Sequence, residues 1–151
     1  MSLHGTLIRE RTFHDVPGSS KKRIIENASQ LIADTAESLD AEEIFAGLIG
    51  RERLGSTGLG EGVAIPHCRL DSCQETTGAL VKLPEPIDFD AIDGNPVDLL
   101  FVLIVPTEAT EAHLQTLAAL AELFSQAEFR EALRRSDDAD SLYQAALSFI
   151  P

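Results

Sequence analysis

The sequence has few basic residues for its size. Twelve Lys and Arg side chains stand against twenty-five Asp and Glu side chains in 151 residues, which gives a formal net charge of −13. That sign opposes binding to the phosphates of nucleic acids and to anionic lipid surfaces. We therefore expect no nucleic-acid partner, and we attribute the acidic surface chiefly to solubility.

Long hydrophobic runs are also missing. No stretch reaches the roughly 18 apolar residues that a membrane-spanning helix needs, and the first residues show no charged segment followed by an apolar one. These absences predict a cytoplasmic protein with no membrane insertion.

Cysteine is scarce too, because only Cys68 and Cys73 occur. Their spacing fits neither a familiar redox pair nor a four-ligand zinc set, so we expect two reduced thiols, no metal and no cofactor. A hydrolase or metal site built from His67 and the two thiols is the weakest alternative, since neither a spaced ligand set nor a nucleophile elbow supports it.

What the sequence does contain is a glycine-rich stretch, RERLGSTGLGEGVAIPHCRL, at residues 51–70. Its glycines allow the backbone to approach a ligand closely and to present N–H groups to it, which suits an anion. Residues 63–65 then form a brief apolar strand, and Pro66 ends its hydrogen-bond ladder. The next residue is His67.

An imidazole with an ordinary pKa near 6.5 is mostly neutral at pH 7, so one ring nitrogen keeps a lone pair for nucleophilic attack. A glycine-rich loop followed by His67 therefore indicates covalent chemistry on phosphate. A His at a strand end is also common as a hydrogen-bonded structural residue, and the residue pattern alone leaves both interpretations open.

The stretch RERLGSTGLGEGVAIPH closely resembles the active-site signature of the fructose/mannitol-type IIA components of the bacterial phosphoenolpyruvate-dependent phosphotransferase system. The resemblance continues through SSKKRIIE, PEPIDFDAIDGNPVDLLFVLIVP and EAHLQTLAALAELF, and so covers nearly the whole chain. It is most similar to the nitrogen-regulatory IIA branch. The resemblance implies an α/β fold, with a mixed β-sheet flanked by helices in a single layered domain over residues 1–151. Residues 1–10 are a candidate for a loosely ordered N-terminal extension.

The resemblance also assigns roles to residues. His67 matches the phosphorylated His of the family, and His113 matches its second active-site His. Arg51 matches an Arg that helps to hold the phosphoryl group, for which a guanidinium fork is well suited. Three residues of the glycine-rich loop are candidate supports of that group: Ser56, Thr57 and Gly60. For the two hydroxyls, turn residues that bond their own backbone are an equal alternative.

These roles imply a phosphocarrier that accepts a phosphoryl group on His67 from a histidine phosphocarrier protein, without metal or cofactor. As a nitrogen-type regulatory protein it would contact a transporter, a kinase or a transcription factor according to its phosphorylation state. The alternative is a IIA component that passes phosphate to a IIB component for fructose/mannitol-type sugar uptake.

Hydrophobic patterning predicts strands near residues 12–16, 63–65, 77–83 and 99–105, and helices near residues 20–38, 40–53, 111–125, 125–135 and 138–149. The continuous apolar run 99–105 predicts a central strand covered on both faces. Capping boxes are expected at Asp40 with Glu43 and at Ser125 with Glu128. The helix 111–125 is expected to bury five side chains: Leu114, Leu117, Ala118, Ala121 and Phe124.

Overall fold

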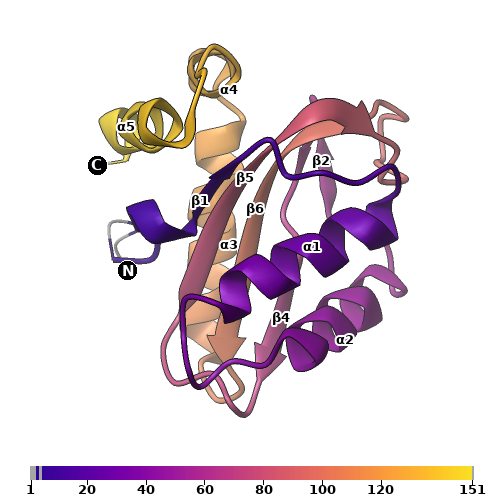
Figure 1. Ribbon diagram of the computed structural model, residues 1–151, viewed down its shortest axis with the longest axis vertical. Coiled ribbons are helices and arrows are strands. Elements are labelled where there is room, and N and C mark those ends of the chain that lie inside the picture. The colour runs from indigo at the N-terminus through magenta and orange to yellow at the C-terminus, as the bar shows by residue number, and fades with distance from the viewer. Residues whose placement is uncertain (1–2, 4, 151) are drawn as a thin grey trace.

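The computed structural model describes residue 3 and residues 5–150, and it shows a six-stranded sheet with helices on both faces (Figure 1). The helices are α1 (Lys21–Ala33), α2 (Ala41–Glu52), α3 (Thr110–Phe124), α4 (Ala127–Arg134) and α5 (Ala139–Phe149), preceded by a 3-10 turn, η1 (Arg9–Arg11). The strands are β1 (Thr12–His14), β2 (Gly58–Gly60), β3 (Val63–Ala64), β4 (His67–Leu70), β5 (Thr77–Ile87) and β6 (Val97–Pro106). Among the described residues, no helix combines the length and the apolar character that crossing a membrane requires.

The sheet is mixed, as the resemblance implied. Its strand order is β1-β5-β6-β3-β2, and β4 pairs with β6 beyond the end of β3. The β5–β6 pair is antiparallel, whereas β1–β5, β3–β6 and β4–β6 are parallel. Strand β6 therefore has neighbours along both edges, and the predicted central strand is confirmed.

The side chains of β6 fill two cores, one on each face of the sheet. Leu100, Val102 and Ile104 join the core beneath α1 and α2. The alternate residues Leu99, Phe101, Leu103 and Val105 join the core beneath α3, α4 and α5. Because successive side chains of a strand point to opposite faces, one continuous apolar run supplies both layers.

Three helices begin at side chains that accept a backbone N–H, namely Ser20, Asp40 and Asp138. The capping box expected at Ser125 and Glu128 is wrong. Ser125 ends α3, and its hydroxyl donates to the Glu122 carbonyl at 2.5 Å. Helix α4 begins at Ala127, and its N-cap residue Gln126 makes no side-chain capping bond. Ser125 therefore caps the C-terminus of α3 and is not available to cap the N-terminus of α4.

The buried face of α3 also differs from the prediction. Leu114 is 62% exposed, whereas His113, Thr116 and Leu120 are buried. Residues three and four positions apart share a helix face, so turning His113 toward the sheet moves Leu114 to the surface.

The described part of the N-terminal segment is packed, in contrast to the extension that we expected. Leu3 and Leu7 are buried in the core beneath α5, and the Thr6 carbonyl accepts the Gly78 N–H at 3.1 Å. A Cβ on Gly78 would lie 2.7 Å from the Thr6 side chain, so the glycine permits this contact. Residues 1, 2 and 4 lie outside the described residues.

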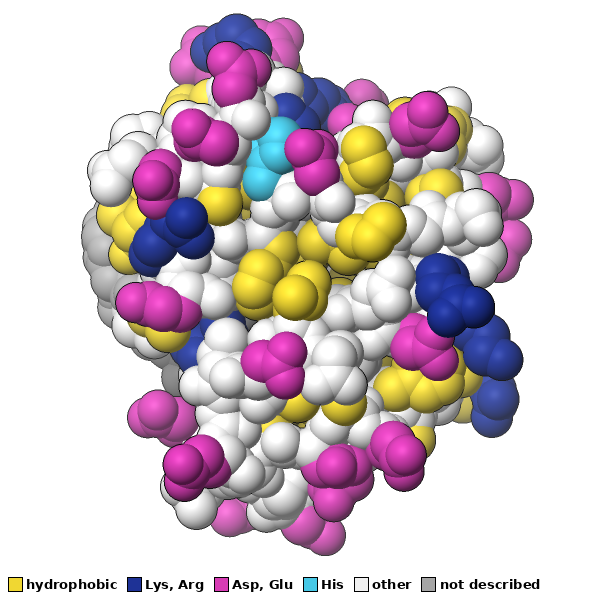
Figure 2. Space-filling model, in the orientation of Figure 1, with side chains coloured by type: hydrophobic (Ala, Val, Ile, Leu, Met, Phe, Trp, Pro, Cys, Tyr) yellow, Lys and Arg dark blue, Asp and Glu magenta, His cyan; other side chains and the backbone are white. Residues whose placement is uncertain are grey.

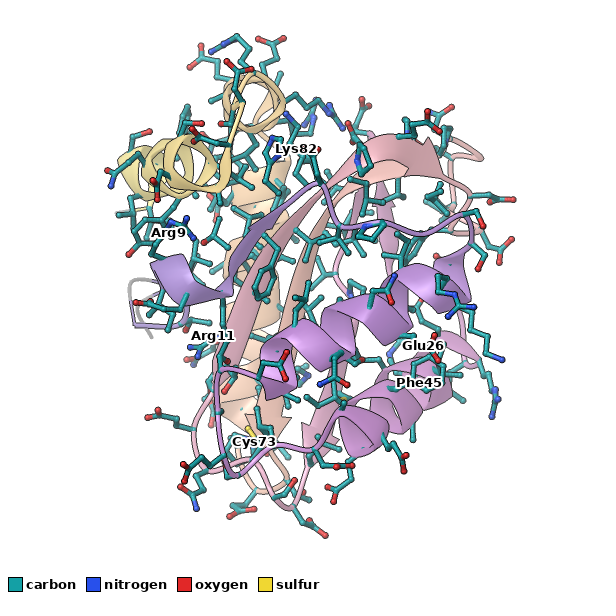
Figure 3. The ribbon with its side chains drawn as sticks, in the orientation of Figure 1. Arg9, Arg11, Glu26, Phe45, Cys73 and Lys82 are labelled. Atoms are coloured by element: carbon teal, nitrogen blue, oxygen red, sulfur yellow. The ribbon has the colours of Figure 1, made fainter. Side chains whose placement is uncertain are left out.

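Lys82 joins the C-terminal helices to the sheet. It extends from β5 toward the end of α4 (Figure 3), where its Nζ donates to the carbonyls of Arg134 and Ser136, each at 2.7 Å. The His14 ring Nε2 lies 3.0 Å from the Ser136 carbonyl as well. These contacts satisfy carbonyls that a helix end would otherwise leave unpaired.

Candidate functional site

His67 lies at a break in the parallel ladder along β6. The prediction ended a strand at Pro66, but pairing resumes directly afterwards as β4, with His67 opposite Leu103. The His67 Nδ1 is 2.7 Å from the Ile65 carbonyl oxygen. Because a carbonyl only accepts, Nδ1 carries the proton of the neutral ring and Nε2 keeps its lone pair.

His113 reaches the same place from the first turn of α3. The two imidazole centroids are 5.3 Å apart and the rings are tilted by 53°. His113 is only 4% exposed, and its Nδ1 has no hydrogen-bond partner among the described residues. A buried polar atom without a hydrogen bond costs folding free energy, so this nitrogen is suited to bind a ligand atom or a water.

Both rings are held in the neutral form. Burial lowers the pKa of His67 below its ordinary 6.5, the Ile65 hydrogen bond opposes that change, and the nearby Arg51 charge adds to it. Burial lowers the pKa of His113 to about 4, with further lowering from His67 and Arg69. Neutral rings are required if one is to act as a nucleophile.

Arg51 and Arg69 supply positive charge beside the rings. Arg51 lies in the last turn of α2, and its Nη1 donates to the Gly55 carbonyl at 2.9 Å. Arg69 lies on β4 two residues after His67, on the same face of the strand. Arg69 was not predicted as a site residue, because the predicted strand ended at Pro66; the alternation of the HCRL segment places it on the same face as His67.

Two hollows flank His67. One, of about 340 Å³, is lined by Arg51, Thr57 and His67 together with apolar side chains that include Leu117 and Ala121. The other, of about 360 Å³, is lined by Arg51, Arg69 and both imidazoles. Residues from α2, the glycine-rich loop, β4 and α3 thus surround one imidazole.

The three candidate supports lie differently. Thr57 is buried in the first hollow, and its hydroxyl has no partner among the described residues. The Ser56 hydroxyl lines the same hollow but donates to the Phe89 carbonyl at 2.7 Å and accepts the Gly58 N–H at 3.0 Å. Gly60 lines a separate hollow. The structure therefore leaves only the Thr57 hydroxyl available near His67.

Cys68 lies between His67 and Arg69 on β4 and lines the second hollow with them, whereas Cys73 follows the strand. A Cβ on Gly47 of α2 would come within 2.9 Å of the Cys68 sulfur, so this thiol packs against the helix. Burial raises the pKa of Cys68 to about 12 and also raises that of Cys73. Burial therefore disfavours the thiolate at both positions, so neither sulfur is a ready nucleophile beside His67.

Residues 6–148 match the family model for the phosphoenolpyruvate-dependent sugar phosphotransferase system, EIIA 2. The chain belongs to this family. It is 51% identical over 142 residues to the nitrogen regulatory protein of Pseudomonas aeruginosa, covering 94% of this chain and 92% of that protein. It is 41% identical over 145 residues to the nitrogen regulatory protein of Escherichia coli, covering 95% of this chain and 88% of that protein.

Solved structures of EIIA 2 relatives confirm the fold. The nitrogen regulatory protein IIA-Ntr from Neisseria meningitidis superimposes with a TM-score of 0.86 at 41% identity, covering 94% of this chain and 97% of that one. The mannitol IIA of Escherichia coli gives a TM-score of 0.76 at 20% identity, covering 93% and 98% respectively. The second comparison extends the shared architecture to a sugar-specific IIA.

Proposed function

We propose that this EIIA 2 protein accepts a phosphoryl group on His67 Nε2 from a histidine phosphocarrier protein, and that it acts as a nitrogen-type regulatory IIA protein. The observation that carries the proposal is the set of unsatisfied groups around one ring. Nε2 has a free lone pair, and the His113 Nδ1 and the Thr57 hydroxyl are buried without hydrogen-bond partners among the described residues. A phosphoryl group on Nε2 would bring acceptor oxygens to these groups.

The transfer step exchanges one N–P bond for another. The lone pair of His67 Nε2 forms a new N–P bond while the N–P bond of the donor imidazole breaks, and the leaving electron pair returns to the donor ring. Negative charge is spread over three equatorial oxygens during such a transfer. Arg51 and Arg69 compensate that charge, while the Ile65 carbonyl stabilises the positive charge that develops on the His67 ring.

Exposed apolar side chains near the site support a protein donor. Leu59, next to Gly58 in the first hollow, is 44% exposed, and Leu114, next to His113, is 62% exposed. Leu54 lines the second hollow and is 84% exposed. Exposed hydrophobic groups around a polar centre are typical of a surface that docks another protein.

The regulatory assignment draws on the identity to nitrogen regulatory proteins reported above. In this role, phosphorylation would change which transporter, kinase or transcription factor the protein contacts. Passage of phosphate to a IIB component is the alternative, and a solved complex joins the mannitol IIA to phosphorylated IIB in Escherichia coli at 19% identity to this chain.

Mass spectrometry of the intact protein tests the carrier chemistry. The protein is incubated with phosphoenolpyruvate, enzyme I and a histidine phosphocarrier of a nitrogen-type system, beside the His67→Ala variant. We expect an acid-labile gain of one phosphoryl group in the wild type and none in the variant. No gain, with the carrier itself shown to be phosphorylated, would contradict the proposal.

His113→Ala tests the second imidazole in the same reaction. Removal of a hydrogen-bonding group that contacts the transferred phosphoryl should slow transfer about 10- to 100-fold, with the fold checked by circular dichroism. Transfer at the wild-type rate would remove His113 from the proposed site.

A further inference from the structure

A buried ion pair lies directly behind the glycine-rich loop. The side chain of Glu52, at the end of α2, is 4% exposed, and its Oε1 is 2.9 Å from the Nζ of Lys21 at the start of α1. The same oxygen accepts the Thr57 N–H at 3.3 Å. Removing a carboxylate from water is costly, and the phosphoryl-transfer step described above uses neither charge.

The hydrogen bonds continue from this carboxylate to the nucleophile. The Thr57 carbonyl accepts the Ile65 N–H at 3.1 Å, and the Ile65 carbonyl accepts the His67 Nδ1 proton at 2.7 Å. Each donor in the sequence His67, Ile65, Thr57 points toward the Glu52 end. The carboxylate carries a fixed negative charge, so its bond to the Thr57 N–H is charge-assisted and holds the loop in this arrangement. The N–H and C=O of Thr57, like those of Ile65, belong to different peptide groups, so the bonds transmit position to the His67 ring.

We propose that Glu52 is a positioning residue for phosphoryl transfer, which acts through Thr57 and Ile65 to hold the His67 ring with Nδ1 protonated and Nε2 free. Lys21 holds the carboxylate in place. The inference rests on the proposed function, since it assigns Glu52 to the same reaction. It resembles the way in which groups beyond the ligand shell fix the tautomer of a metal-binding His.

The packing of the loop supports this role. Lys21 also donates to the Phe89 carbonyl at 3.3 Å, and the Ser56 hydroxyl donates to the same oxygen. The loop is therefore fastened at Ser56 and at Thr57, on both sides of one peptide bond. The fastening at Thr57 places its unpartnered hydroxyl in the hollow beside His67.

The Glu52→Gln variant tests the negative charge of Glu52 separately from its hydrogen bond to Thr57. The amide oxygen of Gln can still accept the Thr57 N–H, but the negative charge is gone. The other groups around the ring, Arg51, Arg69 and His113, stay in place. Since the Glu52 charge raises the pKa of His67, its removal should shift the titration midpoint of that ring to lower pH.

The matched control is Glu26→Gln. Glu26 makes the same type of contact with Arg23, at 2.8 Å on α1, but both side chains are about half exposed. Loss of an exposed pair changes little, so this variant removes one negative charge from the molecule without touching the loop.

Two measurements on the full chain decide the matter. Nitrogen-15 NMR of the His67 ring in the unphosphorylated protein reports the tautomer and the titration midpoint, and single-turnover transfer from the phosphorylated carrier reports the rate. We expect Glu52→Gln to lower the midpoint, to increase the minor tautomer and to slow transfer about tenfold at saturating donor. Glu52→Ala should slow it further, and Glu26→Gln should match the wild type.

A wild-type tautomer, midpoint and rate in Glu52→Gln would overturn the proposal. If Glu52→Ala does not fold, Glu52→Gln alone decides. The NMR readout needs no phosphoryl transfer, so failure of the proposed function itself would show separately, as a wild-type protein that takes up no phosphoryl group.

Discussion

At the residue scale, one hydrogen bond selects which ring nitrogen of His67 keeps its lone pair. The Ile65 carbonyl, two residues before His67, binds the Nδ1 proton at 2.7 Å and so leaves Nε2 as the free base. The tie is local in sequence, because only Pro66 separates the two residues. The local carbonyl thus orients the His67 ring, and the proposed role of Glu52 is to hold that carbonyl and its loop in place.

The pKa of His113 predicts a pH-dependent stability. Its value of about 4 in the folded protein lies below the ordinary 6.5 of an unfolded chain. As the pH falls below 6.5 the unfolded chain takes up a proton that the folded one refuses, so the contribution is complete above pH 6.5 and is lost toward pH 4. We expect the free energy of unfolding of His113→Gln to fall less than that of the wild type between pH 7 and about pH 4.5, by roughly 2 kcal/mol. Urea unfolding at both pH values measures the difference, and equal losses in the two proteins would contradict it.

Arg69 predicts a charge effect on transfer. Arg69→Gln removes a guanidinium from the hollow that both imidazoles line, so we expect phosphoryl transfer to slow about tenfold. Arg53→Gln is the control, because Arg53 is an exposed cation at the end of α2 that lines neither hollow beside His67. Transfer rates measured with phosphorylated carrier should separate the two variants, and equal rates would count against Arg69.

The sequence indicated which residues form the candidate site, but not which of their polar atoms lack hydrogen-bond partners. His67, His113 and Arg51 follow from a motif, and the structure brings them together. The missing partners of the His113 Nδ1 and the Thr57 hydroxyl could not be predicted, because they depend on which groups the fold brings near each atom. Arg69 could have been found from strand alternation alone.

At the element scale, the turn between β2 and β3 depends on Arg134 of α4. Gly62 has a φ of +79°, and a Cβ on it would collide with the Arg134 guanidinium. That guanidinium binds both oxygens of Asp98, and it also donates to the Glu61 carbonyl at 2.6 Å. A helix far along the chain thus holds the second half of the glycine-rich loop.

Gly62→Ala and Gly94→Ala form a matched pair. Gly94 has a similar φ of +74°, but no heavy atom of the described residues lies within 4 Å of a Cβ placed there. Backbone strain alone should cost Gly94→Ala about 1 kcal/mol of unfolding free energy, whereas the added collision at Gly62 should raise the cost to about 3 kcal/mol. Equal costs in denaturant unfolding would show that Arg134 moves aside freely.

Some helices and strands could be predicted from the sequence more accurately than others. The strand β6 and the side-chain cap at Asp40 rest on local patterns, and those predictions are confirmed. The reciprocal half of the expected capping box is wrong, because the Glu43 carboxylate accepts the Ser72 hydroxyl instead. The errors arose where neighbouring elements compete for residues. Ser125 serves the end of α3 rather than the start of α4, and β5 continues to Ile87 through two prolines because its ladder with β6 is irregular after Lys82.

At the scale of the whole molecule, the two faces of the sheet carry separate cores and an acidic exterior. Figure 2 shows the face formed by α1 and α2, where acidic side chains are spread widely and basic ones gather at the margins. Against a net charge of −13, Arg51 and Arg69 form a local positive region around His67. The anionic phosphoryl oxygens of a donor would therefore meet positive charge chiefly around His67.

The reactivity of the two thiols measures how often the core beneath α1 and α2 opens to solvent. Cys68 and Cys73 are both buried there, and Cys73 lies toward the lower end of the sheet in Figure 3. Since a thiol reacts only as an exposed thiolate, we expect the native protein to react with a disulfide reagent at pH 8 at least about 1000-fold more slowly than the urea-unfolded chain. Rapid labelling of a folded sample would contradict the burial of these side chains.

Strand β4 pairs with β6 along one edge, and no other described strand pairs with it. An unpaired edge lets a donor reach His67 without displacing a neighbouring strand, but it also offers backbone groups to which a second chain could add, as in aggregation. A charged side chain on such an edge opposes that pairing. Arg69 is such a side chain beside His67, so we expect an apolar replacement there to promote self-association as well as to slow the proposed transfer.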